Sequence, residues 1–229
     1  MGTNVVVGGS HGIGRLLAER AAGRGETVVI TSRDKGRAQG VAAEIGGATT
    51  GIALDLAAPT TIEAALAEVG EVDHLVITAI EQTQQTIAAF DIADAINSAT
   101  IKLVGYAETV RVLHGRFGPD ASVVLFGGLA KERPYPGSTM VTTINAGVAG
   151  LMRTLVRELA PVRVNALHSG VVGDSPKWIA QKDTHPAVAR TPVGRLVTMA
   201  EVADATEFLL RNGGMNAHEL NVDGGWLIS

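Results

Sequence analysis

Short apolar runs alternate with longer amphipathic stretches along most of the chain. The apolar runs predict β-strands at residues 5–7, 27–31, 51–54, 75–78, 122–126, 162–166 and 219–222. The amphipathic stretches predict helices at residues 15–24, 35–45, 60–69, 91–113, 139–159 and 200–210. Strands that alternate with helices predict an α/β fold, in which a doubly wound parallel sheet of about seven strands carries helices on both faces.

The composition agrees with such a fold and excludes several other classes of protein. With 229 residues, of which 46% are hydrophobic and 18% charged, the chain can form one domain over residues 1–229 with a large core. The net charge of −4 and the lack of a basic run give no indication of a nucleic-acid partner. Cysteine is absent, which excludes disulfides and thiolate chemistry.

Targeting and metal signals are also missing from the sequence. No apolar run reaches the length of a membrane span, and no signal peptide precedes the first predicted strand. The six histidines lack the spacing of a metal site. We therefore expect a cytoplasmic protein with no membrane partner and no metal.

Residues 5–14 read Val-Val-Val-Gly-Gly-Ser-His-Gly-Ile-Gly and combine a buried strand, a glycine turn and the start of a helix. At a helix start, backbone N–H groups lack intrahelical partners and the helix dipole adds partial positive charge. Glycine allows a pyrophosphate to approach because no Cβ blocks it. An ordinary glycine-rich turn would look similar, but the position directly after a hydrophobic strand favours a phosphate-binding turn.

The spacing of these glycines, G-x-x-x-G-x-G, resembles the fingerprint of the short-chain dehydrogenase/reductase family. Later landmarks resemble the same family, namely Asp55-Leu56, Arg163-Val-Asn165, Gly194-Arg-Leu196 and Val222-Asp-Gly-Gly225. The resemblance covers the whole chain and implies a single Rossmann-like domain that binds a nicotinamide dinucleotide. The residues expected at the cofactor are Gly8, Ser10, His11, Gly12, Ile13, Gly14, Ser32, Arg33, Asp55, Leu56, Thr78, Ala79, Lys102, Gly170 and Val172.

The end of the second predicted strand favours NADP(H) as the cofactor. An acidic residue at this place would bind a ribose 2′-hydroxyl and repel a 2′-phosphate. Ser32 stands there instead and Arg33 follows it, so a hydroxyl and a guanidinium could accept a 2′-phosphate. The alternative is a solvated arginine in a surface turn, and the adjacent Asp34 could partly offset its charge.

The resemblance weakens at the catalytic positions. Most proteins that resemble this chain carry a Ser, a Tyr-x-x-x-Lys pair and an Asn. Gly128 stands in the serine position, Val141 in the tyrosine position and Asn145 in the lysine position. The asparagine position holds Lys102. None of the four usual side chains is therefore in its usual place.

Lysine and asparagine have in effect exchanged helices. If Lys102 and Asn145 both face the cofactor, the ammonium could hold the nicotinamide ribose and polarise a bound carbonyl. Alternatively, Lys102 points to solvent and Asn145 only supports a tight helix contact. The remaining candidates for a proton donor are Tyr135, which could equally be a packing residue between two prolines, and His168, which could be a structural histidine at a strand end.

Two further segments carry expectations about ligand access and assembly. Residues 174–191 correspond to the substrate lid of the family, with Trp178 and Ile179 as an apolar wall or as part of a mobile surface helix. The small residues at 146–150 could pair helices across a two-fold axis in a homodimer or homotetramer, or could serve packing within the chain.

These features favour an NADP(H)-dependent oxidoreductase with a non-standard active site. Its reaction would be hydride transfer between nicotinamide and a small-molecule carbonyl, imine or activated alkene. A non-catalytic NADP(H)-binding sensor or scaffold would also combine an intact nucleotide turn with altered catalytic positions. An isomerase or lyase that reuses the pocket is the third alternative.

Overall fold

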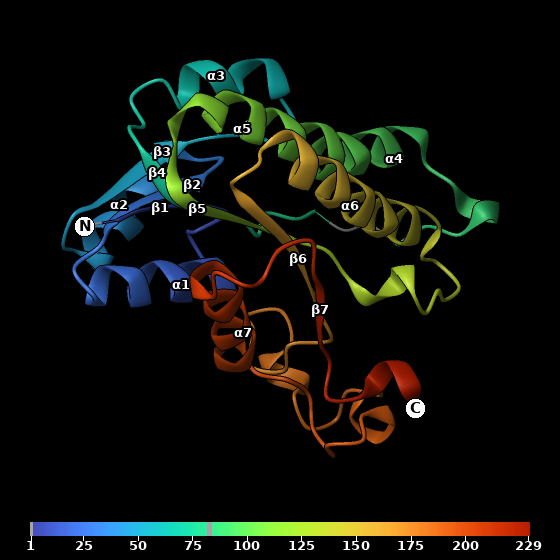
Figure 1. Ribbon diagram of the computed structural model, residues 1–229. Coiled ribbons are helices and arrows are strands. Elements are labelled where there is room, and N and C mark those ends of the chain that lie inside the picture. The colour runs from blue at the N-terminus through green and yellow to red at the C-terminus, as the bar shows by residue number, and fades with distance from the viewer. Residues whose placement is uncertain (1, 82–83) are drawn as a thin grey trace.

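The computed structural model describes residues 2–81 and 84–229, which form three layers with a sheet in the middle (Figure 1). Its parallel strands are β1 (Thr3–Val7), β2 (Thr27–Ser32), β3 (Thr49–Ala53), β4 (Val72–Ile77), β5 (Phe117–Phe126), β6 (Arg163–Ser169) and β7 (Glu219–Val222). Within the described residues they form one seven-stranded sheet in the order β3-β2-β1-β4-β5-β6-β7. The strand order reverses between β1 and β4, and this switch point is where such sheets bind ligands. The predicted α/β fold is confirmed.

Helices cover both faces of the sheet. The face bearing the N-terminal helix carries α1 (Gly12–Gly23), α2 (Lys35–Ile45) and α7 (Met199–Arg211), and the other carries α3 (Ile62–Ala65), α4 (Ile92–Ala99), α5 (Gly105–Leu113) and α6 (Thr139–Glu158). A π-helical segment, Thr100–Val104, joins α4 to α5. Short 3-10 helices lie at Pro59–Thr61, Ile87–Ala89, His114–Arg116, Leu129–Lys131, Ile179–Gln181, Val188–Arg190 and Trp226–Ile228. No helix in the described part of the chain has the length and apolar character that a membrane crossing requires.

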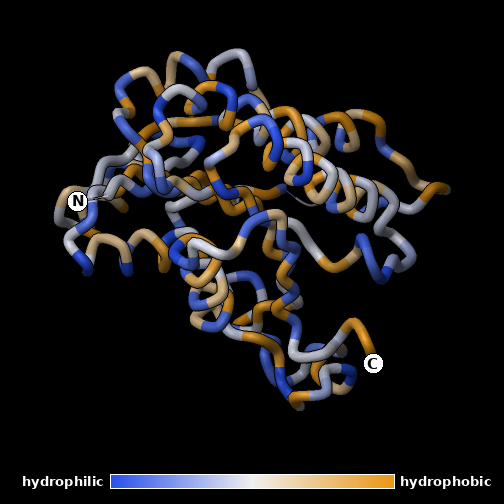
Figure 2. Tube along the Cα trace, viewed as in Figure 1, coloured by the Kyte–Doolittle hydropathy of each residue, from blue (hydrophilic) through white to orange (hydrophobic). Residues whose placement is uncertain are grey.

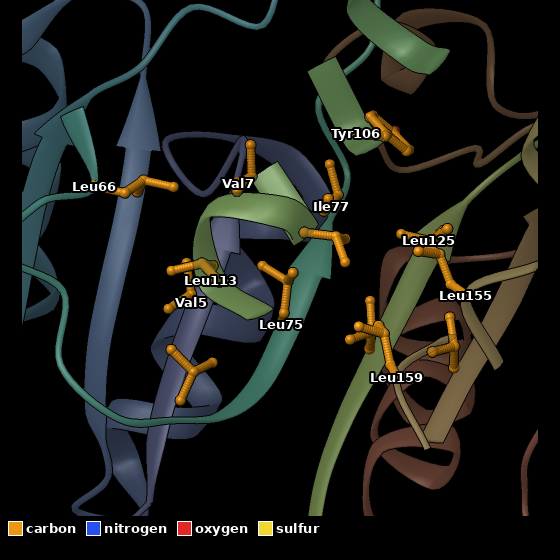
Figure 3. Close-up of a cluster of buried hydrophobic side chains, with 14 of the residues drawn as sticks. Val5, Val7, Leu66, Leu75, Ile77, Tyr106, Leu113, Leu125, Leu155 and Leu159 are labelled. Carbon is orange, nitrogen blue, oxygen red and sulfur yellow. The ribbon is translucent and has the colours of Figure 1, made fainter. Parts of the chain in front are cut away.

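The core follows from the alternation of side chains along the strands. In β1, Val5 and Val7 face the cluster under α5 and α6, whereas Val6 faces the cluster under α1 and α2. Figure 3 shows the first cluster, in which Leu75 and Leu125 of the central strands meet helix residues such as Leu113. Because both faces of a parallel sheet are covered, its strands are apolar on both sides, and Figure 2 shows this concentration along the central strands.

The predicted helix at residues 60–69 is much shorter in the structure. Only a 3-10 turn and α3, Ile62–Ala65, are helical there. Leu66 and Val69 still pack in the core, which explains the helical spacing of the apolar residues. The Arg116 guanidinium donates to the Val69 carbonyl oxygen at 2.7 Å and also to that of Leu66. A side chain from a distant segment thus supplies donors to carbonyl groups that follow α3.

Strand ends differ from prediction where polar residues continue a buried strand. β5 begins at Phe117 rather than at 122, and β6 extends to Ser169 rather than ending at 166. In β6 the additional residues pair with β7, and His168 is completely buried. Hydropathy alone ended the predicted strand too early because backbone pairing does not require apolar side chains.

Candidate functional site

The glycine turn between β1 and α1 is tightly packed on its inner side. Gly8 has a φ of 87°, and a Cβ there would lie 2.8 Å from the Ala79 backbone nitrogen. The Gly8 N–H donates to Thr31 Oγ1 at 3.2 Å, and the Thr78 hydroxyl donates to the Val7 carbonyl oxygen at 3.2 Å. These contacts hold the turn in a fixed shape.

The outer side of the same turn is open. Gly12 has a φ of 55°, and a Cβ there would meet only Pro176, at 3.9 Å. His11 precedes α1 as its N-cap and its side chain makes no capping bond. The first N–H groups of α1 therefore border open space, which is the arrangement that binds an anionic group at a helix start.

A cavity of about 130 Å³ lies along this turn, at the carboxyl ends of the first four strands. Of the residues expected at the cofactor, those that line it are Gly8, Ser10, His11, Ser32, Arg33, Asp55, Leu56 and Ala79. Gly12, Ile13 and Gly14 begin α1, and Thr78 lies beneath the turn. Gly170 and Val172 lie at and just after the end of β6, outside the lining of this cavity. We call this cavity the nucleotide cleft, after the ligand that the sequence predicts for it.

Other lining residues of the nucleotide cleft were not expected from the sequence. They are Val7, Thr31, Arg37, Leu54, Ile80, Glu81 and Ile101. Arg37 had a signal in the sequence, because it lies four positions after Arg33, and in the structure it brings a second guanidinium to the same cavity. No pattern in the sequence indicated Glu81, because only the fold brings the segments that follow β2 and β4 together.

The charges at the rim are paired in a way that the sequence did not predict. Arg33 Nη1 lies 3.2 Å from Glu81 Oε2, and the two side chains are 71% and 44% exposed. Asp34, which the sequence offered only as a partial offset to the Arg33 charge, accepts the Arg37 backbone N–H at 2.6 Å and caps α2. Glu81 is therefore the acidic partner of Arg33.

Lys102 and Asn145 come together inside the protein. Lys102 Nζ donates to Asn145 Oδ1 at 2.9 Å, and the two residues are 3% and 2% exposed. The alternative in which Lys102 points to solvent is therefore wrong. Lys102 lies on the π-helical segment, a rare distortion that often occurs at functional sites. Burial lowers the pKa of Lys102 to about 7, because the charged ammonium loses its hydration.

The surroundings of this pair are mostly small or apolar. A cavity of about 10 Å³ lies beside it, and its wall is formed by Glu81, Ser98, Lys102, Met140, Val141, Ile144 and Asn145. A Cβ on Gly128 would lie only 2.7 Å from Asn145 Nδ2, so glycine leaves room for the amide. The result is a weakly hydrated amine that can exchange a proton near neutral pH, held by an amide rather than by a carboxylate.

His168 does not fit the role of a proton donor near neutral pH. The residue is fully buried, and burial lowers its pKa to about 4, with the Lys131 charge as a smaller cause. Its ring packs where a side chain on Gly127 would stand, and Nε2 lies 3.5 Å from Glu219 Oε2. His168 is a neutral core residue at pH 7, as in the structural alternative.

Tyr135 and the predicted lid at residues 174–191 do not line either of these two cavities. Tyr135 is 41% exposed, and its backbone N–H donates to Ser138 Oγ at 3.0 Å. In residues 174–191, Trp178 packs edge-on against His185 with ring centroids 4.8 Å apart, whereas Ile179 is 50% exposed. The structure does not bring Tyr135 together with Lys102.

Comparisons with known proteins agree with this geometry. The family described as enoyl-(acyl carrier protein) reductase matches residues 7–227. A carbonyl reductase family member 4 from Danio rerio is 29% identical over 230 residues, covering 96% of this chain and 96% of its own length. A 3-oxoacyl-[acyl-carrier-protein] reductase from Escherichia coli is 28% identical over 238 residues, covering 96% of this chain and 95% of its own.

Solved structures show the same relationship at the level of the fold. A short chain dehydrogenase/reductase family protein superposes with a TM-score of 0.89 at 29% identity, covering 100% of this chain and 98% of that protein. The match extends over the sheet, the nucleotide cleft and the C-terminal segment. The chain belongs to the short-chain dehydrogenase/reductase family of oxidoreductases, whose members use nicotinamide cofactors.

Proposed function

We propose that this protein is an NADP(H)-dependent oxidoreductase with a non-standard active site. Its reaction is hydride transfer between nicotinamide and a small carbonyl, imine or activated alkene. The observation that carries this proposal is the nucleotide cleft, where the glycine turn and the two guanidinium groups of Arg33 and Arg37 line one cavity. A dinucleotide with an additional phosphate matches that combination of backbone donors and positive charge.

The residues of the cleft fit the cofactor on structural grounds. A Cβ at Gly8 would fill the inner side of the turn, while the outer side at Gly12 is open for a diphosphate. Ser32 and Arg33 would hold the 2′-phosphate, and Asp55 lines the part of the cleft expected to hold the adenine. When bound, the nicotinamide supplies or accepts the hydride.

Lys102 is the group that we assign to proton transfer. The positions of the usual serine and tyrosine hold Gly128 and Val141, so neither supplies a hydroxyl. The Lys102 ammonium can polarise a carbonyl or imine and donate a proton from Nζ, and its pKa of about 7 suits both steps near neutral pH. Asn145 fixes the position of Nζ through its amide oxygen. An activated alkene or an imine needs no tyrosinate of the usual kind, which favours these substrate classes.

A non-catalytic nucleotide-binding protein is the second candidate function. The observation that favours it is the size of the cavity beside Lys102, about 10 Å³, which is room for about one water molecule. A sensor or scaffold could keep the nucleotide cleft and still hold Lys102 only as a buried structural pair. The two candidates differ in whether bound cofactor turns over.

The experiment has two stages that separate these candidates. Binding of NADPH and NADH is first measured by fluorescence and by thermal shift, and we expect NADPH to bind more tightly. NADPH consumption is then followed with a panel of aldehydes, ketones, imines and enones, using the unaltered protein and the Lys102→Met variant. We expect turnover with at least one class and its loss in the variant. Tight NADPH binding without any turnover would favour the sensor, and no binding of either dinucleotide would exclude both candidates.

A further inference from the structure

Glu81 faces Arg33 across the rim of the nucleotide cleft. Arg33 follows β2 and Glu81 follows β4, 48 positions later, and both side chains line the cleft. Arg33 Nη1 donates to Glu81 Oε2 at 3.2 Å. Asp34, the acidic neighbour in sequence, is engaged as the cap of α2. Of Asp34 and Glu81, the carboxylate paired with Arg33 is therefore Glu81.

We propose that Glu81 determines cofactor specificity by competing with the 2′-phosphate of NADP(H) for the Arg33 guanidinium. This inference rests on the proposed function, in which Arg33 binds that phosphate. A phosphate monoester carries close to two negative charges at neutral pH and is a strong acceptor for a guanidinium. To contact it, Arg33 must give up the Glu81 carboxylate.

The two cofactors differ in what they require of this ion pair. NADH presents a 2′-hydroxyl, so it can bind while Arg33 and Glu81 stay together. NADPH leaves Glu81 as an unpaired negative charge on the same rim as its phosphate, and like charges at short range repel. Glu81 therefore weakens the binding of the phosphorylated cofactor selectively and brings the affinities of NADPH and NADH closer together.

The test compares the dissociation constants of NADPH and NADH for the unaltered protein and for Glu81→Gln. Exposed ion pairs are weak, so we expect NADPH to bind about two- to fivefold more tightly to Glu81→Gln, with little change for NADH. Glu63→Gln is the matched control, because Glu63 is an exposed carboxylate that pairs with Arg111 on the opposite side of the sheet from α1. We expect this control to leave both constants unchanged.

The Arg33→Gln background tests whether Glu81 acts through the guanidinium. In that background, Glu81→Gln should no longer tighten NADPH binding. Equal tightening of both cofactors by Glu81→Gln, or a full effect that persists without Arg33, would overturn the inference. Failure of the proposed function is distinguishable, because the unaltered protein would then bind neither dinucleotide.

Discussion

At the residue scale, two glycines leave space for buried polar side chains. Gly127 leaves the space that the His168 ring fills, and Gly128 leaves the space that the Asn145 amide fills. Asn145 in turn accepts from Lys102. A side chain added at either glycine would therefore contact a buried polar neighbour.

Replacing Gly128 by serine, the residue that the family resemblance implies at this position, should destabilise the protein. Gly128 has an extended φ of −169°, so the cost of Gly128→Ser comes from contact with Asn145 and not from backbone strain. We expect the free energy of unfolding to fall by about 1–3 kcal/mol, the usual range for overpacking. Urea unfolding measures this cost. In an Asn145→Ala background the cost should largely disappear, and an undiminished cost there would contradict the steric explanation.

The buried Lys102 should make stability depend on pH above neutrality. The pKa of Lys102 is about 7 in the folded protein, against 10.5 for an exposed lysine, so between these two pH values the unfolded chain binds more protons than the folded one. Stability therefore rises with pH across this window. The Lys102→Met variant lacks this titration. Between pH 7 and pH 10, the free energy of unfolding of the unaltered protein should therefore rise relative to that of the variant by on the order of 3 kcal/mol. If the free energies of unfolding of the two proteins change in parallel with pH, Lys102 is hydrated and the prediction is wrong.

At the element scale, the start of α2 and the π-helical segment shape the site. Asp34 caps α2 and thereby directs its first turn, with Arg37, toward the nucleotide cleft. The π-helical segment carries Lys102 and Leu103 toward α6, where a Cβ on Gly147 would lie 2.8 Å from Leu103 Cδ2. The small residues at 146–150 thus serve packing within the chain at Gly147, whereas Gly150 borders open space.

Removing the cap of α2 should affect stability more than cofactor choice. Asp34→Ala loses the bond to the Arg37 N–H and should lower the free energy of unfolding by about 1 kcal/mol. Asp34→Asn keeps a capping oxygen and should retain most of that stability. The ratio of NADPH to NADH affinity should change little in Asp34→Asn, as measured by titration. A rise in that ratio as large as for Glu81→Gln would assign the competing charge to Asp34.

At the scale of the whole molecule, α4 leaves large apolar side chains in solvent. Ile92 and Ile96 are 68% and 62% exposed and lie one turn apart on the same face. We predict that this face contributes to the self-association expected from the family. Light scattering should give the molar mass of a homodimer or homotetramer for the unaltered protein. The double variant Ile92→Lys/Ile96→Lys should give a lower molar mass, because its subunits associate less. A monomeric unaltered protein would contradict this prediction.

Much of the fold followed from the sequence because it depends on local patterns. The alternation of apolar strands with amphipathic helices predicted the parallel sheet, and the helix at residues 35–45 has its predicted bounds. The turn at Gly8 was recognisable because its glycines directly follow a hydrophobic strand. The structure gives the physical reason for glycine there, since a Cβ on Gly8 would lie 2.8 Å from the Ala79 backbone nitrogen. The local pattern predicted α3 too long. Only Ile62–Ala65 is helical, and the Val69 carbonyl oxygen accepts from Arg116, a residue of a distant segment.

The sequence by itself determined the class of fold and the place of the glycine turn between β1 and α1, because spacing and residue type suffice for these. Only the tertiary structure decided how charges are paired. It joined Lys102 to Asn145, enclosed His168 and set Glu81 against Arg33. Burial and proximity between distant segments set the protonation and the partner of a charged group, and neither quantity is encoded in the local pattern of the chain.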